Sequence, residues 1–359
     1  MLPHSPFALL RRGDSSCRRM SAEILQTHTP ALLAKAIEQA AAVLRSGGVI
    51  GAPTETVYGL AANAFDPQAV AQIYALKGRP AHNPIIIHVA SAEMARACAS
   101  MWPAMADVLG SAFWPGPLTL VMPRSERVPD IVTAGGPTVG IRWPQHPFMQ
   151  GVIRACGFPL AAPSANLANR LSPTNASHVA SQLGEALRLI VDGGDCNVGI
   201  ESTVVDVTGA SPVVLRPGMI SETAIQAAVA ACPLEPGAGS LPAPGKTLRS
   251  PGQLDRHYSP QARLLVRSWQ DEGGLGHLLA TEGVDPSRTC IIAHTRIPMG
   301  GRFPNVMLIP DDAEAFARAL YAELHRCDEM GVDWIVVEAL PETPDWAGIR
   351  DRLCRASAH

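Results

Sequence analysis

In the stretch VIGAPTETVYGL (49–60), an apolar run stops abruptly at three consecutive polar residues. Its first four residues are typical of a buried strand, whereas Thr54, Glu55 and Thr56 interrupt that pattern. A surface turn would favour Asn, Asp or Gly, and an ordinary strand would alternate polar and apolar residues for longer. By itself, the stretch indicates the polar end of a buried strand with a turn at Gly59.

Helix and strand signals alternate on both sides of this stretch. Thr29-Pro30 and Asp66-Pro67 each place a proline after an N-cap, and Gly47 and Gly78 end the two predicted helices. Further strands are predicted over PIIIHVA (84–90), LTLVM (118–122), TVGIRW (138–143), FPLAAP (158–163), LRLIVDGG (187–194), STVVDVTG (202–209) and PVVLRPG (212–218). Such a mixture over about 200 residues predicts one α/β or α+β domain around a large sheet.

The second part of the chain has a different organisation. Residues 233–260 are dense in Pro, Gly and Ser and lack apolar periodicity, which indicates an interdomain linker. Strands and helices alternate again over residues 261–359 and predict a small Rossmann-like domain. This region contains no G-x-G-x-x-G turn, so nothing in it supports dinucleotide binding.

The first residues resemble neither domain. Residues 1–20 contain four arginines, three serines and one acid, a composition loosely typical of a transit peptide. The alternatives are a disordered extension or a start at Met20, and we favour the extension. The predicted boundaries are therefore an extension over 1–28, a first domain over 29–232, a linker over 233–260 and a second domain over 261–359.

Composition excludes several classes of protein. A hydrophobic content of 47%, with 17% charged residues, predicts a well-packed enzyme-like protein. The net charge of −3 is no global signature of nucleic-acid binding, although a local RNA-facing patch stays open. The 8 cysteines are scattered without a Cys-x-x-Cys pair, and no signal peptide or membrane-length apolar run is seen. We therefore expect reduced thiols, a cytoplasmic location and no membrane contact.

The segment KGRPAHNP (77–84) gathers cations at the entrance of a predicted strand. Lys77 and Arg79 are also placed to interact with the negative end of a helix dipole, which is the simpler interpretation. With His82 and Asn83 beside them, however, they form a cluster suited to a polyanion.

The run APSANLANRLSPT (162–174) is rich in small hydroxyl and amide side chains. Ser164 and Asn166 suit the capping of a turn. The same small residues would also let backbone N–H groups approach a phosphate.

Three further polar residues lie at strand ends or edges, where each is unremarkable alone. They are Arg142, Ser202 and Arg216. The sequence has no G-x-S-x-G elbow, no H-E-x-x-H helix and no Cys/His spacing for a metal. We therefore expect positioned cations and hydroxyls, rather than a nucleophilic triad, to carry any chemistry.

Taken in order, these motifs resemble one family. PTETVYGL, KGRPxxNP, PGPLT, IRWP, APSAN, SPT, ESTVVD and LRPG follow the order of the YrdC-like domain of threonylcarbamoyl-AMP synthases, over roughly residues 30–220. SPGQLDRHYSP and the small domain after it resemble the long, two-domain form. One departure is Ala168-Asn169-Arg170-Leu171-Ser172-Pro173, where S-G-R-P-S-P is common.

The resemblance implies an α/β fold, with a YrdC-like twisted open sheet, a concave pocket and a small Rossmann-like C-terminal domain. It implies a nucleotidyltransferase that makes L-threonylcarbamoyl-AMP and pyrophosphate from L-threonine, bicarbonate or CO2, and ATP with Mg²⁺. The product would serve threonylcarbamoylation of the tRNA adenosine beside the anticodon. The implied partners are the small substrates and the downstream tRNA threonylcarbamoyl-transferase machinery, with at most weak contact to tRNA itself.

The resemblance also implies site residues, carried over motif by motif. The expected catalytic residues are Lys77, Arg79, Ser164 and Asn166. The expected L-threonine pocket comprises Thr56, His88, Arg142, Ala162 and Ser202. The expected ATP side comprises Arg79, Asn83, Thr138, Ser164, Ser172, Arg216 and Tyr258, with no metal-ligating side chain. The linker around His257-Tyr258 is expected to fold over the pocket as a lid.

Two other functions stay open at this point. One is a non-catalytic RNA-binding YrdC-like module, against which the near-neutral charge and the retained threonine motifs argue. The other is a related carbamoyl-adenylating enzyme with a different acceptor, against which the lack of acylphosphatase and zinc-finger segments argues.

Overall fold

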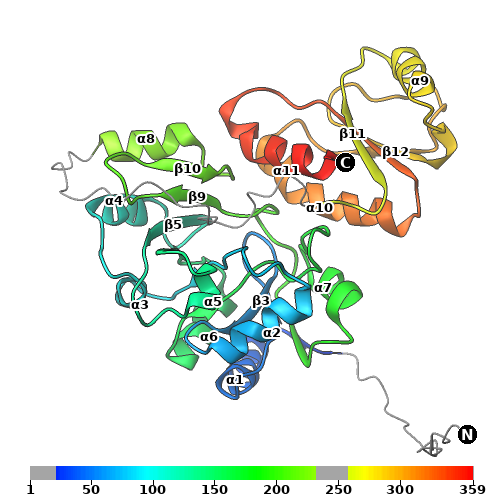
Figure 1. Ribbon diagram of the computed structural model, residues 1–359. Helices are drawn as coiled ribbons and strands as arrows, with labels where there is room; N and C mark the ends of the chain where they lie inside the picture. Colours follow the sequence, from blue (N-terminus) through cyan, green and yellow to red (C-terminus); the bar gives the residue numbers. More distant parts are fainter. Residues whose placement is uncertain (1–21, 232–257, 359) are drawn as a thin grey trace, which may run out of the picture.

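The computed structural model describes residues 22–231 and 258–358, which form two α/β domains (Figure 1). The first contains a mixed sheet of ten strands and the second a parallel sheet of four strands. The predicted fold class, a large twisted sheet followed by a small Rossmann-like domain, is confirmed. The expectations for residues 1–21 and for most of the linker, His257 included, lie outside the described residues.

The large sheet has the strand order β1-β8-β2-β3-β7-β4-β6-β5-β9-β10. Its strands are β1 Glu23–Gln26, β2 Ile50–Ala52, β3 Gly59–Asn63, β4 Ile87–His88, β5 Leu118–Pro123, β6 Thr138–Arg142, β7 Leu160–Ala161, β8 Leu189–Asp192, β9 Thr203–Asp206 and β10 Val213–Arg216. Parallel and antiparallel pairs both occur, so strands distant in sequence become neighbours. Arg142 of β6, for example, pairs with His88 of β4 on one side and Thr119 of β5 on the other.

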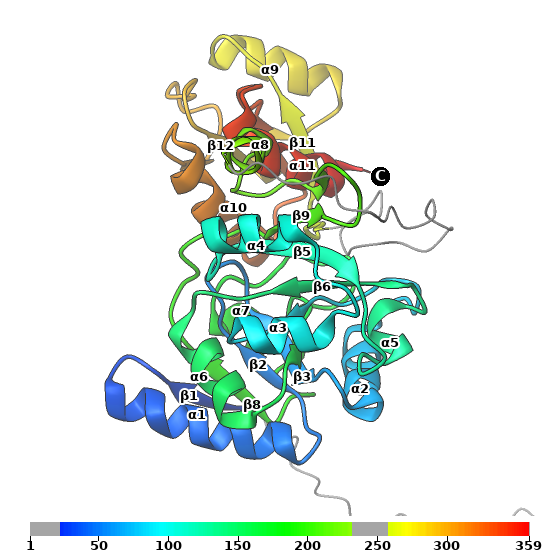
Figure 2. The same ribbon diagram turned by 90° about the vertical axis from the view of Figure 1, so that its left-hand side faces the viewer.

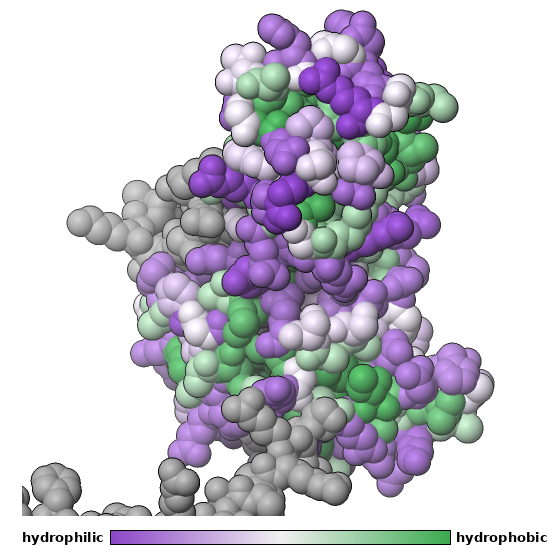
Figure 3. Space-filling view, turned by 90° about the vertical axis from the view of Figure 1, so that its right-hand side faces the viewer, coloured by the Kyte–Doolittle hydropathy of each residue, from purple (hydrophilic) through white to green (hydrophobic). Residues whose placement is uncertain are grey.

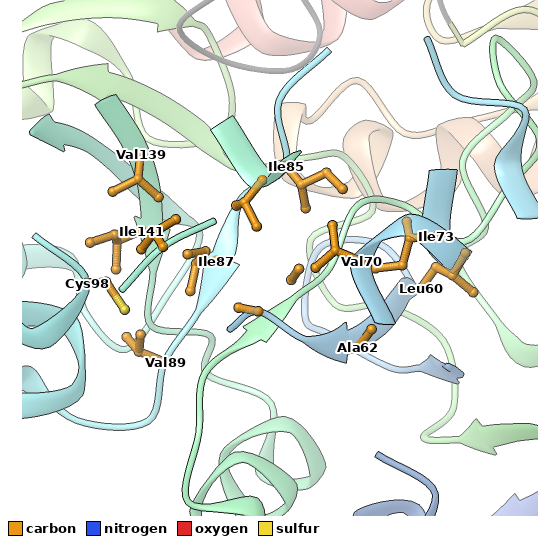
Figure 4. Close-up of a cluster of buried hydrophobic side chains, with 14 of the residues drawn as sticks. Leu60, Ala62, Val70, Ile73, Ile85, Ile87, Val89, Cys98, Val139 and Ile141 are labelled. Atoms are coloured by element: carbon orange, nitrogen blue, oxygen red, sulfur yellow. The ribbon is translucent and has the colours of Figure 1, made fainter. Parts of the chain in front are cut away.

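Eight helices accompany this sheet within the described residues: α1 Pro30–Arg45, α2 Pro67–Lys77, α3 Ala92–Cys98, α4 Ala104–Phe113, α5 Asp130–Thr133, α6 Pro147–Cys156, α7 Ala176–Leu183 and α8 Glu222–Ala230. As predicted, α1 and α2 begin at proline after side-chain caps. Helices α1 and α6 run side by side and share one apolar cluster with β2 and β8 (Figure 2). A second cluster packs α2 against the central strands (Figure 4).

Two features of the first domain differ from the sequence-based expectation. Gly59 does not form a turn; it begins β3, which pairs antiparallel with β2, so residues 53–58 form the connection of a hairpin. The prediction failed because GLAAN has neither β-branched residues nor alternation. The expected extension over 1–28 is also too long, since β1 pairs with β8. Only two apolar residues mark that edge strand, too few to give a strand signal.

The second domain has three layers. Its sheet has the order β11-β14-β12-β13, from β11 Arg263–Arg267, β12 Thr289–Ala293, β13 Asn305–Leu308 and β14 Trp334–Glu338. Helix α9 Glu272–Thr281 covers one face, and α10 Ala313–Glu329 and α11 Ala347–Ser357 cover the other, with short 3-10 turns at Pro286–Arg288 and Pro344–Trp346. Ile291 and Ile292 of β12 point to opposite layers, as adjacent strand residues do.

Helices α10 and α11 lie between the small sheet and the large domain (Figure 1). Three glycines allow this close approach. A Cβ at Gly199 would come within 2.3 Å of the carbonyl oxygen of Ala317 in α10, and Gly348 of α11 packs directly on the backbone of Gly218. At these glycines, the helices therefore approach the backbone of the first domain directly.

A pair of histidines adds to this interface. The rings of His178 in α7 and His325 in α10 stack with their centroids 3.9 Å apart. His325 also lies 3.1 Å from the carbonyl oxygen of Ser172, through Nε2. Burial, and then the neighbouring His325, lower the pKa of His178 from 6.5 to about 3. Burial also lowers the pKa of His325, so the pair is neutral at pH 7.

The outer surface is mixed. Figure 3 shows hydrophilic and hydrophobic side chains interspersed over both domains on one face. None of the helices in residues 22–231 and 258–358 is long and apolar enough to cross a membrane.

Gly199→Ala is expected to lower the free energy of unfolding by about 3 kcal/mol, because the new Cβ meets α10 and the backbone φ of +84° is strained for alanine. Gly283→Ala is the matched control: its φ is +69°, but no atom lies within 4 Å of the added Cβ. It should cost only about 1 kcal/mol. Urea unfolding measures both, and equal losses would contradict the close interface.

The histidine pair predicts a loss of stability in mild acid. Because the folded-state pKa of His178 is depressed, the unfolded chain binds more protons between about pH 6.5 and pH 3, and stability falls as the pH drops through that window. His178→Phe keeps a stacking ring and should reduce the slope between pH 7 and pH 5 by up to about 1.4 kcal/mol per pH unit. Urea unfolding at the two pH values measures this. An unchanged slope in His178→Phe would refute the prediction.

Candidate functional site

One pocket in the first domain gathers most of the residues expected at the site. Its lining comprises Thr54, Thr56, Val57, Gly59, Arg79, Ile86, His88, Arg142, Ala162, Pro163, Ser164, Glu201, Ser202, Arg216 and Tyr258. The lining therefore includes all five residues expected in a threonine pocket. It also includes four expected on the ATP side, namely Arg79, Ser164, Arg216 and Tyr258.

The hairpin connection 53–58 is a braced loop. Thr54 Oγ1 accepts the backbone N–H groups of Thr56 and Val57, at 3.2 and 3.3 Å, and donates to the carbonyl of Val57 at 2.7 Å. Such bonds let a short hydroxyl side chain hold a turn in place. Thr54 therefore braces the loop, and the side chain of Thr56 is presented to the pocket.

Arg142, at the end of β6, is held by that loop. Its Nη1 donates to Thr56 Oγ1 at 2.8 Å, Nη2 lies 2.8 Å from a carboxylate oxygen of Glu55, and Nε donates to the carbonyl of Gly116 at 3.3 Å. A guanidinium has five N–H donors, so three contacts leave one N–H on each terminal nitrogen. Burial alone would raise the pKa of Glu55, but the charge and hydrogen bond of Arg142 outweigh it and lower that pKa.

His88 and Ser202 lie beside Arg142. Burial, and then the charge of Arg142, hold the pKa of His88 well below its usual value, so its ring is neutral. Ser202 Oγ lies 2.8 Å from the Oγ1 of Thr119, the partner of Arg142 in the neighbouring strand. The ends of β4, β6 and β9 thus bring a cation, a neutral imidazole and hydroxyls together.

The backbone of residues 163–165 runs antiparallel to the start of β3. Gly59 and Ser164 form a β-bridge, and the N–H of Leu60 donates to the carbonyl of Pro163 at 2.7 Å. A Cβ at Gly59 would lie 3.3 Å from that of Ala162, so a glycine at this position lets the two segments approach. This pairing places Ser164 in the pocket wall.

Lys77 and Asn166 lie behind that wall and do not line the pocket. The ammonium of Lys77 donates to the carbonyls of Ser164 and Asn166 and contacts Asn166 Oδ1 at 3.4 Å. The amide of Asn166 donates to the carbonyls of Leu167 and Arg170. Lys77 and Asn166 therefore hold the shape of the loop that carries Ser164.

Arg79 lines the pocket, and residues outside the lining hold its side chain in place. Its guanidinium donates to the carbonyl and side-chain oxygens of Asn83, at 3.0 and 2.7 Å, and to the carbonyl of Pro84. Asn83 itself does not line the pocket. Thr138 also stays outside the lining, at the opposite end of β6 from Arg142.

Glu201 is the main residue that the sequence-based prediction missed. It lines the pocket at 7% exposure and accepts hydrogen bonds from Ser172 Oγ at 2.5 Å, Arg352 Nε at 2.7 Å and the Tyr321 hydroxyl at 3.2 Å. Burial raises its pKa, but Arg352, Arg216 and these hydrogen bonds together lower it to about 2. The available signal was its position directly before Ser202 in ESTVVD.

Tyr258, a pocket residue from the expected lid, is 1% exposed and has a φ of +62°. The N–H of the next residue, Ser259, donates to the carbonyl of Asn169 at 2.9 Å. Asn169 has a φ of +65° and stands where the S-G-R-P-S-P pattern of the resembled family has glycine. Asparagine tolerates this left-handed conformation better than most other non-glycine residues, so the loop can adopt it without glycine.

Family models cover nearly the whole chain. A model described as "Telomere recombination", of the Sua5, YciO and YrdC group, matches residues 42–218. A second model, described as "Threonylcarbamoyl-AMP synthase, C-terminal domain", matches residues 220–358.

Individual relatives agree with these models. Threonylcarbamoyl-AMP synthase of Pyrococcus abyssi is 37% identical over 90% of this chain and 94% of its own, and that of Bacillus subtilis is 38% identical over 89% and 92%. The crystal structure of P. abyssi Sua5 complexed with L-threonine has a TM-score of 0.82 and 37% identity, covering 93% of this chain and 96% of the other. The chain therefore belongs to the threonylcarbamoyl-AMP synthase family, in its two-domain form.

Proposed function

We propose that the pocket binds L-threonine and ATP together and joins them through bicarbonate or CO2, giving L-threonylcarbamoyl-AMP and pyrophosphate. The observation that carries this proposal is the presence of three arginines, Arg79, Arg142 and Arg216, in one pocket, the last two at most 4% exposed. Buried guanidinium groups beside small hydroxyls suit a carboxylate and a polyphosphate.

L-threonine is assigned to the side of Arg142. The two remaining N–H groups of its guanidinium would take the substrate carboxylate as a bidentate pair. The neutral ring of His88 would accept a hydrogen bond from the substrate amine, and Thr56 and Ser202 would contact its polar atoms. Ala162 closes this side with a methyl group. The complex of P. abyssi Sua5 with L-threonine supports this assignment.

ATP is assigned to the side of the pocket lined by Arg79, Ser164 and Arg216. Tyr258 also lines this side. Lys77, Asn83 and Asn166 act on this side by holding Arg79 and the Ser164 loop in place. We expect Thr138 and Ser172 to act from outside the pocket lining as well. Mg²⁺ enters with ATP and spreads the phosphate charge. No group of three or more His, Cys, Asp or Glu side chains that could hold a metal occurs within the described ranges.

The proposed chemistry needs no nucleophile from the protein. The threonine amine loses a proton and bonds to carbon, giving an N-carboxylate with loss of water when bicarbonate is the donor. An oxygen of that carboxylate then bonds to the α-phosphorus of ATP, and the bond to the β-phosphate oxygen breaks, releasing pyrophosphate. The residues of the pocket contribute by positioning the two reactants and by stabilising the charge on phosphate oxygens.

The product would pass to the downstream tRNA threonylcarbamoyl-transferase machinery, with at most weak contact between this chain and tRNA. We place the reaction in the cytoplasm, which the free thiols of the six described cysteines support. No observation favours a non-catalytic RNA-binding module, because Arg142 and Arg216 are buried in the pocket rather than displayed on a face.

The purified chain is expected to release pyrophosphate from ATP only when L-threonine and bicarbonate are both present. L-Serine, which lacks the threonine methyl group, should be used less efficiently by about tenfold, since one buried methyl is worth roughly 1–3 kcal/mol. A coupled pyrophosphate assay with both amino acids measures this. Turnover without an amino acid, or none with L-threonine, would refute the proposed function.

Lys77→Met is expected to lower kcat/KM by about 100-fold or more, because it removes the ammonium that holds the Ser164 loop. The pyrophosphate assay measures the loss, and a thermal melt checks the fold. Lys35→Met, an exposed lysine of α1, is the control and should keep wild-type kcat/KM. Normal activity in a folded Lys77→Met variant would remove Lys77 from the proposed site.

A further inference from the structure

A negative side chain lies where the proposed function places a polyphosphate. Glu201 lines the pocket together with Arg79 and Arg216, and its low pKa keeps it ionised. A buried carboxylate beside ATP repels the phosphates strongly, since water screens little there. The pocket therefore needs a compensating cation for Glu201 in addition to the cations that face the nucleotide.

That cation comes from the second domain. Arg352 of α11 is 1% exposed, and its Nε donates to Glu201 Oε2 at 2.7 Å. Its Nη2 donates to the backbone carbonyl of Glu201 at 3.1 Å, and its Nη1 to that of Pro217 at 2.9 Å. Arg352 thus binds both the side-chain carboxylate and the backbone carbonyl of Glu201, and also the backbone of the first domain at Pro217.

Arg352 also orders the groups around Glu201. While one carboxylate oxygen is bound to Arg352, the other accepts the hydroxyl of Ser172 at 2.5 Å. The guanidinium carbon of Arg352 lies 5.3 Å from the ring centre of Tyr258, within the range of a cation–π contact. Ser172 and Tyr258 are both assigned to the ATP side, so Arg352 is linked to three residues of that side without lining the pocket itself.

A buried ion pair between domains is often only structural, and such pairs contribute little net stability. Two observations favour a role in binding here. Glu201 belongs to the lining of the pocket, and its side chain is shared between Arg352 and Ser172. Because Glu201 faces the nucleotide side of the pocket, its pairing with Arg352 affects the charge that a bound polyphosphate meets.

We propose that Arg352 is a positioning residue for ATP binding: the second domain supplies the cation that neutralises Glu201 and holds it against Ser172, so that the pocket accepts a polyphosphate. This inference rests on the proposed function. It gives the second domain a part in the reaction without contact between that domain and the substrates.

The test uses the full chain and measures ATP binding by calorimetry with Mg²⁺ present, and KM for each substrate in the pyrophosphate assay. Arg352→Met is expected to raise the Kd for ATP by about tenfold to 100-fold, while KM for L-threonine changes less than about twofold. Arg350→Met is the matched control on the same helix, because Arg350 bonds only to the nearby carbonyls of Pro341 and Thr343 among the contacts seen. It should bind ATP as the wild type does.

A double variant distinguishes repulsion between Glu201 and the phosphates of ATP from a general loss of pocket structure. Arg352→Met with Glu201→Gln removes both charges, and glutamine still accepts the Ser172 hydroxyl, so ATP affinity should return to within about threefold of wild type. If the double variant binds ATP no better than Arg352→Met alone, the proposal is overturned.

Arg352→Lys keeps the charge and should retain most of the ATP affinity; a loss as large as that of methionine would also overturn the proposal. If Arg352→Met does not fold, the lysine and double variants carry the test, since the lysine keeps a cation beside Glu201 and the double variant removes both members of that pair. Asp351, the other carboxylate bound to Arg352, keeps its contact with Arg355 in both variants. Calorimetry needs no turnover. A wild type that makes no product would therefore refute the proposed function, whereas normal ATP binding by Arg352→Met would refute this inference alone.

Discussion

Arg142 is a buried charge, and the hairpin formed by β2 and β3 supplies the groups that compensate it. Glu55 and Thr56 can do so only because the chain leaves β2, forms a braced loop and returns as β3. That return places β3 against the loop that carries Ser164. Of the three consecutive polar residues that follow β2, Glu55 and Thr56 therefore pair with an arginine of β6, which is 86 residues from Thr56, and Thr54 holds their loop in place.

Glu201 is a second buried charge that needs a partner of opposite charge. Here the buried charge is negative, and its partner comes from another domain, 151 residues along the chain. The backbone contacts at Gly199 and Gly218 bring α10 and α11 close enough for that partner to reach. Packing and electrostatics are thus linked, because a shift of the small domain would move Arg352 away from Glu201, a carboxylate of the pocket lining.

Much of this organisation could be predicted from the sequence, because strong local signals and ordered motifs carried it. The caps of α1 and α2 and most strands were recovered, and nine expected site residues line one pocket. The strand β3 was missed because its alanines and glycine carry no strand signal. The roles of Lys77 and Arg352 were beyond reach, since each depends on which distant carbonyl or carboxylate the fold brings to it.

The separation between Glu201 and Arg352 has a consequence for biosynthesis. Domains generally fold in the order in which the ribosome delivers them, so the first domain can form while the helix that carries Arg352 is still unmade. During that interval Glu201 stands in the nascent pocket without its main counter-charge. A newly made first domain would therefore have its fold and its three pocket arginines, but also an uncompensated carboxylate among them. It would bind a nucleotide more weakly until the second domain has docked.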